Sequence, residues 1–307
     1  GLVCHEVQDD DQGVEMRILV TGAAGFVGSH TANLLEKNRH TVLGIDNLRT
    51  GNMENLVGFH GTFHLCDICD MKLLSRSFSD FKPDVVIHLA AQSAITTAFK
   101  DPWLDLEVNL VGTLNLLELA KKHKVCKFIF SSTSAVYAET KAPWGGMKED
   151  FPKEPQSPYG ISKLGAEHYI RTMFPNHVIF RYGNVYGPRQ TPIGENQVVP
   201  RAIRHFLYGD DFFVHGDGEQ KRDFVYVEDI AFANLEAVRG QVGTYNLATG
   251  KSHSVNEILR EIERYFAVLG FKWSHTDKPD PRGNVHINTS RLKREFGMHL
   301  FTPLLDG

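Results

Sequence analysis

The sequence RILVTGAAGFVG at residues 17–28 decides the fold of this chain. Its first residues form a short run of branched apolar side chains, which is typical of a buried strand, and its second half carries Gly22, Gly25 and Gly28. From Phe26 to Glu36, apolar and polar residues recur at the spacing of an amphipathic helix. The stretch therefore predicts a strand, a glycine-rich turn and a helix, in that order.

A turn of this kind is suited to bind the pyrophosphate of a dinucleotide. Glycines let the backbone turn tightly and approach the phosphates, and the free N–H groups at the start of the helix hold the negative charge. Asp46 follows the next predicted strand, about 20 residues on, where a carboxylate can accept hydrogen bonds from an adenosine ribose. That carboxylate would repel a 2′-phosphate, which favours NAD over NADP, while Arg49 nearby keeps NADP open.

Downstream of this turn, strand and helix patterns continue to alternate. The runs Val85–Ile87 and Phe128–Phe130 are apolar throughout, as expected for strands that are buried on both faces. The sequence therefore predicts an α/β fold with a Rossmann-like, doubly wound parallel sheet. The predicted strands cover Arg17–Val20, Thr41–Ile45, Gly61–Leu65, Asp84–Leu89, Lys127–Ser131, Val178–Arg181 and Thr244–Ala248, and the predicted helices cover Phe26–Glu36, Pro102–Lys122, Ser157–Met173, Pro200–Leu207 and Val227–Val238.

The Gly- and Pro-rich stretch Gly183–Glu195 marks the point where regular alternation stops. We therefore expect a NAD-binding Rossmann domain over residues 16–183 and a smaller α/β, substrate-binding C-terminal domain over residues 184–307. Residues 227–250 fit either domain. Residues 1–15 are acidic and are expected to be a disordered tail or an expression remnant.

The composition excludes several classes of protein. The 307 residues are 42% hydrophobic and 23% charged, as in an ordinary globular protein, and a net charge of −4 gives no basic field for nucleic acid. No apolar run approaches the roughly 18 residues of a membrane span. The four cysteines, at positions 4, 66, 69 and 126, indicate a reducing compartment, for which the cytoplasm is the default. Cys66 and Cys69 lack a second ligand pair, so we expect no metal site.

A second motif, SPYGISK at residues 157–163, points to proton transfer. Ser157 and Pro158 are typical of a helix start, and Tyr159 and Lys163 then lie four residues apart on one helical face. A free tyrosine has a pKa of about 10 and is a weak base at neutral pH. A neighbouring ammonium and a positive nicotinamide ring would both lower that pKa, which would make Tyr159 a usable base toward a substrate hydroxyl.

Three hydroxyl residues, Ser131, Ser132 and Thr133, follow the predicted fifth strand, at the edge where open α/β sheets bind ligands. We expect Thr133 to hydrogen-bond the hydroxyl that Tyr159 deprotonates. A hydrolase built on Ser131 or Ser132 is a remote alternative, because no histidine and acid stand in a recognisable partnership with either serine.

These motifs form part of a larger set that covers most of the chain from Met16 to Gly250. The set comprises TGAAGFVGSH (21–30), DNLRTGNMENL (46–56), HLAAQ (88–92), SSTSAVYA (131–138), SPYGISK (157–163), RYGNVYGPRQ (181–190) and KRDFVYVED (221–229). With these motifs the chain resembles the extended short-chain dehydrogenases/reductases, in particular their nucleotide-sugar epimerase and dehydratase group. The resemblance implies a tightly held NAD that is recycled, a nucleoside-diphosphate sugar in the C-terminal domain, and a homodimer formed by two helices from each subunit.

The resemblance also implies a set of site residues, in which Tyr159, Lys163 and Thr133 carry catalysis. Asp67 is open to a second interpretation as a loop carboxylate, and Asn109 as a buried structural amide. The residues expected to contact NAD are Gly22, Gly25, Phe26, Val27, Gly28, Asp46, Asn47, Asp67, Ile68, Leu89, Ala90, Ala91, Asn109, Ser131, Tyr159 and Lys163. Those expected to contact the nucleotide sugar are Gln92, Thr133, Asn184, Asn196, Val198, Arg222 and Arg282, with Arg222 suited to a diphosphate.

The residues after Thr133 select among the reactions of the group. The dehydratases that this chain resembles carry an acidic pair there, because loss of water needs a general acid and a base, and decarboxylases carry a glutamate at the second position. Ser134 and Ala135 occupy these positions, which argues against both reactions. The chain is then most similar to the UDP-glucose 4-epimerases of the group. This implies inversion at C4 of UDP-glucose or UDP-galactose through a transient 4-keto sugar.

Three alternatives stay open. The segment QSAITTA at residues 92–98 also resembles enzymes that epimerise C2 of a CDP-linked sugar. A dehydratase or ketoreductase on the same scaffold would release a keto product instead of reducing it again. A non-catalytic NAD-binding regulator is the remotest alternative, because such a protein has no use for a phenolate at Tyr159.

Overall fold

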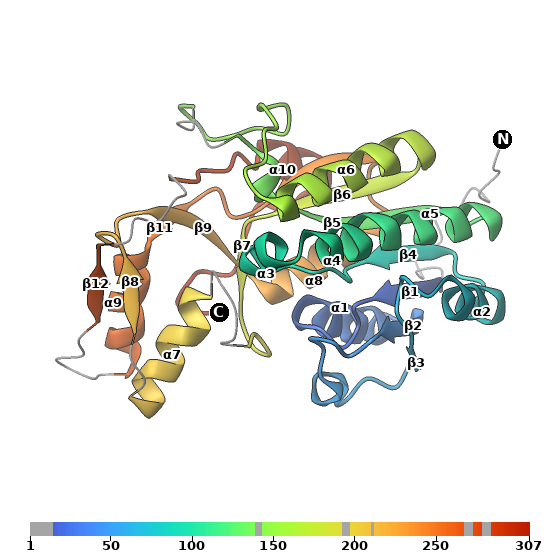
Figure 1. The fold of residues 1–307 in the computed structure, drawn as a ribbon, viewed down its shortest axis with the longest axis horizontal. Helices are drawn as coiled ribbons and strands as arrows, with labels where there is room; N and C mark the ends of the chain where they lie inside the picture. Colours follow the sequence, from blue (N-terminus) through green and yellow to red (C-terminus); the bar gives the residue numbers. More distant parts are fainter. Residues whose placement is uncertain (1–14, 139–142, 192–196, 210–211, 267–272, 278–283) are drawn as a thin grey trace.

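The largest element of the structure is a sheet of seven parallel strands (Figure 1). The computed structural model describes residues 15–138, 143–191, 197–209, 212–266, 273–277 and 284–307. The strands are β1 Arg17–Thr21, β2 Thr41–Asp46, β3 Thr62–Leu65, β4 Val85–His88, β5 Lys127–Thr133, β6 His177–Tyr182 and β10 Gly243–Leu247. Their order in the sheet is β10-β6-β5-β4-β1-β2-β3. Strands β2 and β3 lie on one side of β1, and the chain then crosses to the other side of β1 to add β4 and the strands that follow. The predicted doubly wound parallel sheet is therefore confirmed, and its switch point lies between β1 and β4.

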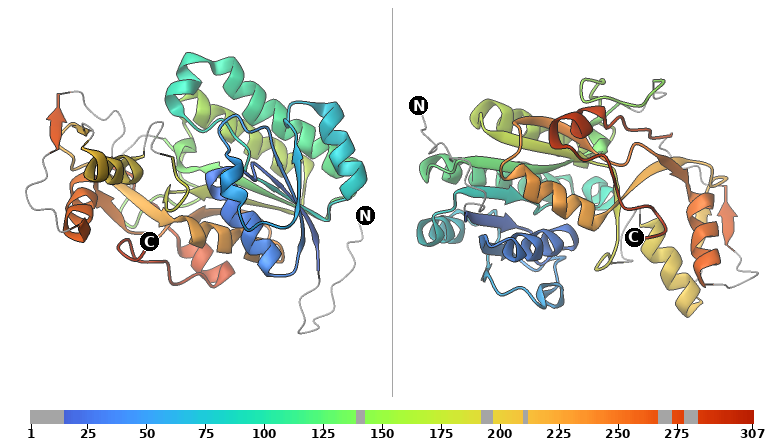
Figure 2. Two further views of the ribbon diagram at one scale, coloured as in Figure 1. Left: turned by 90° about the horizontal axis from the view of Figure 1, so that it is seen from below. Right: turned by 180° about the vertical axis from the view of Figure 1, so that it is seen from behind.

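Helices cover both faces of this sheet (Figure 2). One layer contains α1 (Phe26–Lys37), α8 (Val227–Ala237) and α10 (Ser290–Phe296), and the other contains α2 (Met71–Phe81), α5 (Gly112–Lys122) and α6 (Pro158–Met173). Ile18 and Val20 of β1 face the first layer, whereas Leu19 faces the second. Because both faces are buried, the strands lack a polar side, which explains the apolar runs in the sequence. No helix in the described part of the chain is long and apolar enough to cross a bilayer.

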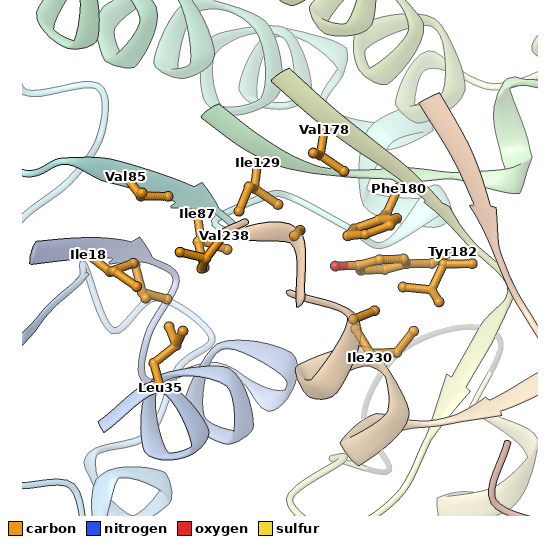
Figure 3. Packing of buried hydrophobic residues seen from close by; sticks show 14 of the residues in the cluster. Ile18, Leu35, Val85, Ile87, Ile129, Val178, Phe180, Tyr182, Ile230 and Val238 are labelled. Carbon is orange, nitrogen blue, oxygen red and sulfur yellow. The ribbon is translucent and has the colours of Figure 1, made fainter. Parts of the chain in front are cut away.

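The core of the first layer runs from the centre of the sheet to its edge (Figure 3). Ile18 of β1, Ile129 of β5 and Phe180 of β6 are fully buried within it. At the edge, the ring of Phe180 lies 6.2 Å from that of Tyr245 on β10 and 5.6 Å from that of Phe296 on α10, measured between centroids. These aromatic contacts join the last strand and the last helix to the sheet.

Residues 227–247 return to this first sheet, which is one of the two assignments that the sequence left open. Helix α8 packs against α1, and β10 pairs in parallel with β6. Asn234 of α8 secures this contact from inside, because its Nδ2 donates to Thr31 Oγ1 at 3.1 Å and its Oδ1 accepts from the Tyr182 hydroxyl at 3.4 Å. The C-terminal half of the chain therefore contributes to both parts of the molecule.

A smaller α/β part lies beside the large sheet (Figure 1). Its three-stranded sheet joins β7 (Asn184–Tyr186), β9 (Lys221–Tyr226) and β11 (Ser252–Ser254), and its two-stranded sheet joins β8 (Phe213–His215) and β12 (Ser274–Thr276). Helices α7 (Val198–Tyr208) and α9 (Val255–Phe266) pack against each other. They enclose Phe212 and Val214 in a core separate from that of the large sheet.

The helix predicted over Pro102–Lys122 is continuous but not uniform. After a short helix α3 (Ile95–Lys100), α4 (Pro102–Leu106) passes through a π-helical turn at Glu107–Val111 into α5. Asn109 lies in this wider turn and is buried. The apolar periodicity does not distinguish such a turn from an α-helix, although π-turns often accompany functional sites. Two 3₁₀ turns complete the described elements, at Met53–Leu56 and Ser134–Val136.

We predict that Phe180→Ala lowers the free energy of unfolding by about 3–5 kcal/mol, because it removes a fully buried ring from a close-packed core. Chemical denaturation followed by circular dichroism measures the change. The matched control is Trp144→Ala, which removes a fully exposed ring and should change the free energy by less than about 0.5 kcal/mol. Equal effects of the two substitutions would contradict the assignment of the core.

Candidate active site

The glycine turn between β1 and α1 has the backbone geometry that a pyrophosphate needs. Gly22 has a φ of +70°, and a Cβ there would lie 2.7 Å from the Ala90 nitrogen. A Cβ on Gly28 would lie 1.9 Å from the Gly22 oxygen, so only glycine lets α1 pack against the turn. Gly25 caps α1 without a side chain, and the first turn of α1 has no acidic residue. The free N–H groups of that turn, which include those of Phe26 and Val27, fit a dinucleotide phosphate.

Asp46 lies beside this turn at the end of β2. Its carboxylate accepts from the Ala24 N–H at 3.0 Å and from the Leu48 N–H at 2.8 Å. Burial raises the pKa of Asp46, and these backbone hydrogen bonds oppose the rise. A carboxylate has about four acceptor positions, so Asp46 can still receive hydrogen bonds from a ribose. The residues present therefore fit NAD, and the negative charge disfavours a 2′-phosphate.

The neighbouring loops continue this site along the sheet edge. Asn47 donates from Nδ2 to Asp67 at 2.7 Å, and Asp67 also accepts from the Cys69 N–H at 2.8 Å. Burial opposes ionisation of Asp67, yet these hydrogen bonds hold its pKa below the usual value. Ile68 is buried against Gly112, where a Cβ would lie 2.6 Å from the Ile68 Cδ1. The geometry thus brings the expected adenosine-side residues to one edge of the sheet.

Tyr159 and Thr133 meet where β5 and α6 come together. Ser157 caps α6 as the sequence predicts, because its Oγ accepts from the Gly160 N–H at 3.1 Å. This places Tyr159 in the first turn, close enough to Thr133 for the threonine hydroxyl to oppose the rise in the pKa of the phenol. Thr133 Oγ1 also accepts from the Ala135 N–H at 3.1 Å, which fixes the threonine hydroxyl at the strand end. A substrate hydroxyl near this pair would find both a base and a hydrogen-bond partner.

Lys163 lies one helical turn further along α6 and is only 2% exposed. Its Nζ donates to the Ser131 carbonyl at 2.8 Å and lies 4.5 Å from the centroid of the Phe130 ring. The Ser131 hydroxyl in turn donates to the His88 carbonyl at 3.2 Å. The ammonium is therefore held at the ends of β4 and β5, within the predicted constellation.

Burial sets the protonation states of Tyr159 and Lys163. Desolvation raises the pKa of Tyr159 to about 12, and the hydrogen bond with Thr133 offsets only part of the rise. Desolvation lowers the pKa of Lys163 to about 7, against the attraction of Asp105 and Glu167. The chain alone thus keeps Tyr159 a neutral phenol near neutral pH. A positive nicotinamide beside the phenol is the remaining influence that would lower its pKa.

Gln92 and Asn109 form a pair that anchors the loop after β4, where Leu89, Ala90 and Ala91 lie partly buried. The Gln92 N–H donates to Asn109 Oδ1 and Asn109 Nδ2 donates to the Gln92 carbonyl, both at 2.9 Å. The Gln92 side chain accepts from the Ala94 N–H and donates to Asp105, at 2.8 and 2.9 Å. In this structure Gln92 therefore contacts its own protein neighbours.

The remaining residues expected to bind the sugar nucleotide are only partly described, and those that are described lie in the smaller part of the molecule. Asn184 begins β7 and Val198 begins α7, both partly buried in the smaller part of the molecule. Arg222 lies in β9, is 4% exposed, and donates from Nη1 to the Lys221 carbonyl at 2.8 Å. Asn196 and Arg282 lie outside the described residues.

The structure adds a hydrogen-bonded chain beneath the cofactor loop that sequence reasoning missed. Thr21 Oγ1 accepts from the N–H groups of Leu89 and Ala90 at 3.1 and 3.0 Å, so its own proton goes to His88 Nδ1 at 2.7 Å. His88 Nε2 then donates to Thr113 Oγ1 at 3.0 Å. Burial lowers the pKa of His88 well below its usual value, which keeps the ring neutral in this role. Only the position of His88 at the end of a strand gave a signal.

Glu167 forms a second buried centre, behind the end of β5. It accepts from Ser132 Oγ at 2.5 Å, from Arg181 at 2.6 and 2.9 Å, and from Arg171 at 2.9 Å. Although burial opposes it, the hydrogen bonds and charge of Arg181 hold the pKa of Glu167 below its usual range. The Ser132 hydroxyl is thus committed to Glu167, which leaves no role for it as a nucleophile.

A solvent-open depression of about 720 Å³ lies between α6, the sheet edge and α10, away from these residues. Its positive charges are largely neutralised, because Glu167 pairs with Arg171 and Arg181, and Glu295 with Arg291. The lining residues are Lys148, Glu149, Asp150, Lys153, His168, Arg171, His177, Arg181, Gly243, Thr244, Ser290, Arg291 and Arg294. None of the predicted site residues is among them. Within the described ranges, no three His, Cys, Asp or Glu side chains are grouped to hold a metal.

The fold and the glycine turn define a Rossmann-type enzyme that uses a nicotinamide dinucleotide. The chain belongs to the NAD dependent epimerase/dehydratase family, whose model matches residues 18–248. It is 40% identical to a putative UDP-glucose 4-epimerase of Methanocaldococcus jannaschii, over 82% of this chain and 83% of that protein. dTDP-glucose 4,6-dehydratases are also similar, at lower identity.

Solved structures give the same relationship. UDP-glucose 4-epimerase of Thermotoga maritima, determined with UDP-glucose, superposes with a TM-score of 0.91 at 34% identity, covering 95% of this chain and 96% of the other. The Thermus thermophilus UDP-glucose 4-epimerase complex with NAD gives a TM-score of 0.83 at 37% identity, covering 91% and 92%. The predicted family, the Rossmann fold and the NAD cofactor are thereby confirmed.

We predict that Asp46→Asn reduces the preference for NAD over NADP by at least about tenfold, because it removes the negative charge that would face a 2′-phosphate. Equilibrium binding of both dinucleotides to the purified protein measures this. Glu54→Gln is the control, since Glu54 is an exposed carboxylate in the nearby 3₁₀ turn and should leave the preference unchanged. An unchanged preference in Asp46→Asn would contradict the assignment of Asp46 to the ribose.

Proposed function

We propose that this chain interconverts UDP-glucose and UDP-galactose by inverting C4 of the sugar, with NAD as a recycled cofactor. The proximity of Tyr159 and Thr133 carries the proposal, because the two side chains offer a base and a hydrogen-bond partner to one sugar hydroxyl at the edge of the cofactor site. The similarity to UDP-glucose 4-epimerases supports UDP as the nucleotide and C4 as the reacting carbon.

The residues divide the work of reversible oxidation. The glycine turn and Asp46 would hold NAD, which would supply the hydride acceptor for oxidation at C4 and the hydride donor for the reduction that follows on the opposite face of the sugar. Tyr159 accepts the proton of the C4 hydroxyl during oxidation and returns it during reduction. Thr133 holds that hydroxyl in line with Tyr159, and Lys163 contributes positive charge next to the phenolate. No external acid or oxidant is consumed, so protons and electrons balance over one turnover.

The surroundings of Tyr159 favour epimerisation over elimination of water. Ser134 and Ala135 follow Thr133 in a 3₁₀ turn, where elimination would need an acid and a base. The buried acids near this centre are already engaged: Asp105 accepts from three side chains, and Glu167 from two arginines and a serine. Neither carboxyl is therefore available to protonate a leaving hydroxyl.

We predict that the purified protein converts UDP-glucose to UDP-galactose, and the reverse, without net formation of NADH. Tyr159→Phe should lower kcat by about 10²–10⁴-fold, because it removes the proton acceptor, while NAD binding stays within a few fold. Product analysis by chromatography and binding of NAD provide the two readouts. Thr133→Val, which keeps the shape but removes the hydroxyl, should give a smaller loss of kcat.

UDP-N-acetylglucosamine and a CDP-linked 2-epimerase substrate belong in the same assay as competing alternatives. Accumulation of a keto sugar would contradict epimerisation and favour a dehydratase. Unchanged turnover in Tyr159→Phe would remove the proposed base, and turnover of the CDP-sugar alone would move the reaction to C2.

We also propose that the enzyme is a homodimer. Large apolar side chains are exposed on the helices from α3 to α6 that lie on one face of the sheet, including Trp103 of α4 at 77% and Ile161 of α6 at 58%. The full set is Phe99, Trp103, Leu106 and Val111 on the run from α3 to the π-helical turn, and Ile161 and Tyr169 on α6. An exposed patch of this kind on two neighbouring helices suits a symmetric helical interface. We place the enzyme in the cytoplasm, because Cys66 and Cys69 form no disulfide.

We predict that Trp103→Glu shifts the protein toward monomers, because burying an unpaired carboxylate at the interface costs several kcal/mol. Size-exclusion chromatography with light scattering measures the mass in solution. Trp144→Glu places the same charge on a fully exposed tryptophan that belongs to neither helix run and should leave the mass unchanged. A wild-type protein that is monomeric, or a dimer that survives Trp103→Glu, would contradict the interface.

A further inference from the structure

A buried carboxylate, Asp105, joins three elements around the reacting centre. It lies in α4 and is 1% exposed. Its Oδ1 accepts from Gln92 Nε2 at 2.9 Å and from Asn109 Nδ2 at 3.0 Å, and its Oδ2 accepts from Ser162 Oγ at 2.6 Å. The three donors come from the loop after β4, the π-helical turn and the catalytic helix α6. A buried carboxylate with this many charge-assisted hydrogen bonds fixes all three elements in one arrangement.

The contact with Ser162 acts directly on the position of the base. Ser162 precedes Lys163 and follows Tyr159 by three residues, and its Oγ also lies 3.0 Å from the Tyr159 carbonyl. The hydroxyl has one proton, and the shorter contact shows that Asp105 receives it. Asp105 therefore holds the first turn of α6 against the loop that follows Ala90 and Ala91.

The charge of Asp105 matters because the ammonium of Lys163 has few counter-charges. Lys163 faces the carbonyl of Ser131, the Phe130 ring and the neutral ring of His88, together with two acids, Asp105 and Glu167. Glu167 is already paired with Arg181 and Arg171, and these two guanidinium groups largely neutralise its charge. Asp105, whose hydrogen-bond donors are all neutral groups, keeps its charge for Lys163.

We propose that Asp105 is a positioning residue for the epimerase reaction: it locks α6 to the cofactor loop and supplies the buried negative charge that keeps Lys163 an ammonium. This role rests on the function proposed above. Loss of the carboxylate would leave a buried lysine that releases its proton more easily, and would also remove a charge that opposes ionisation of Tyr159.

The test is the pH profile of kcat in Asp105→Asn. The active form needs ionised Tyr159 and protonated Lys163, so the two limbs of the profile together report the ionisation of these two groups. Removing a nearby negative charge favours deprotonation of both groups, and both limbs should move to lower pH by about one unit. The KM for UDP-glucose should change by less than about threefold.

Two further variants separate position from charge. Ser162→Ala breaks the link to α6 but keeps the carboxylate, and it should lower kcat by about tenfold at every pH with both limbs in place. Asp223→Asn removes an equally buried carboxylate that binds Thr249 and Gly250, and it should move neither limb. Limbs that stay in place in Asp105→Asn, or wild-type kcat in Ser162→Ala, would overturn the corresponding half of the proposal.

A measurement without sugar keeps this test apart from that of the proposed function. In NAD-loaded protein, the tyrosinate absorbance that Tyr159→Phe abolishes reports the ionisation of Tyr159, and its midpoint should fall in Asp105→Asn. Failure to convert UDP-glucose would overturn the function alone. An unmoved tyrosinate midpoint in folded Asp105→Asn, checked by circular dichroism, would overturn the role of Asp105.

Discussion

The proposed active site depends on burying a lysine ammonium one helical turn from a tyrosine that must lose its proton. Desolvation works against both requirements, since it lowers the pKa of Lys163 to about 7 and raises that of Tyr159 to about 12. The chain offsets part of the cost at Lys163 with the Ser131 carbonyl, the face of the Phe130 ring and the carboxylates of Asp105 and Glu167. In the proposed reaction the positive ring of a bound NAD would offset the remainder, so that the base would become active only when the oxidant is present.

The parallel sheet gathers these groups because its strands end at one edge. The end of β5 supplies Ser131 and Thr133, and the end of β1 supplies the glycine turn. Helix α6, which connects β5 to β6, supplies Tyr159 and Lys163. The neutral His88 connects these ends beneath the cofactor loop. The return of β10 to the sheet closes its far edge and ties the C-terminal segment to the same framework. The hydrogen bonds and strand pairs that hold the sheet together therefore also hold the proposed site residues in place.

The features that could be predicted from the sequence are those that depend on residues close together in the chain. The glycine turn, the Ser157 cap and the strands of the large sheet could be predicted because each is determined by neighbouring residues. The short strands of the smaller part and helices α2 and α9 escaped the periodicity, and the π-helical turn resembles an α-helix in sequence. Asp105 and Glu167 were missed because each binds a distant serine: Asp105 accepts from Ser162, 57 residues along the chain, and Glu167 accepts from Ser132, 35 residues away. Distant pairing of this kind leaves no local signal.

In the proposed reaction the hydride removed from C4 returns to C4 within one active site. UDP-glucose carrying deuterium at C4 tests this most directly, with the UDP-galactose product examined by mass spectrometry and NMR. The account predicts that the product keeps its deuterium at C4 and takes up no hydrogen from solvent at any carbon. Loss of the label to water, or solvent hydrogen at C5 or C6, would contradict it.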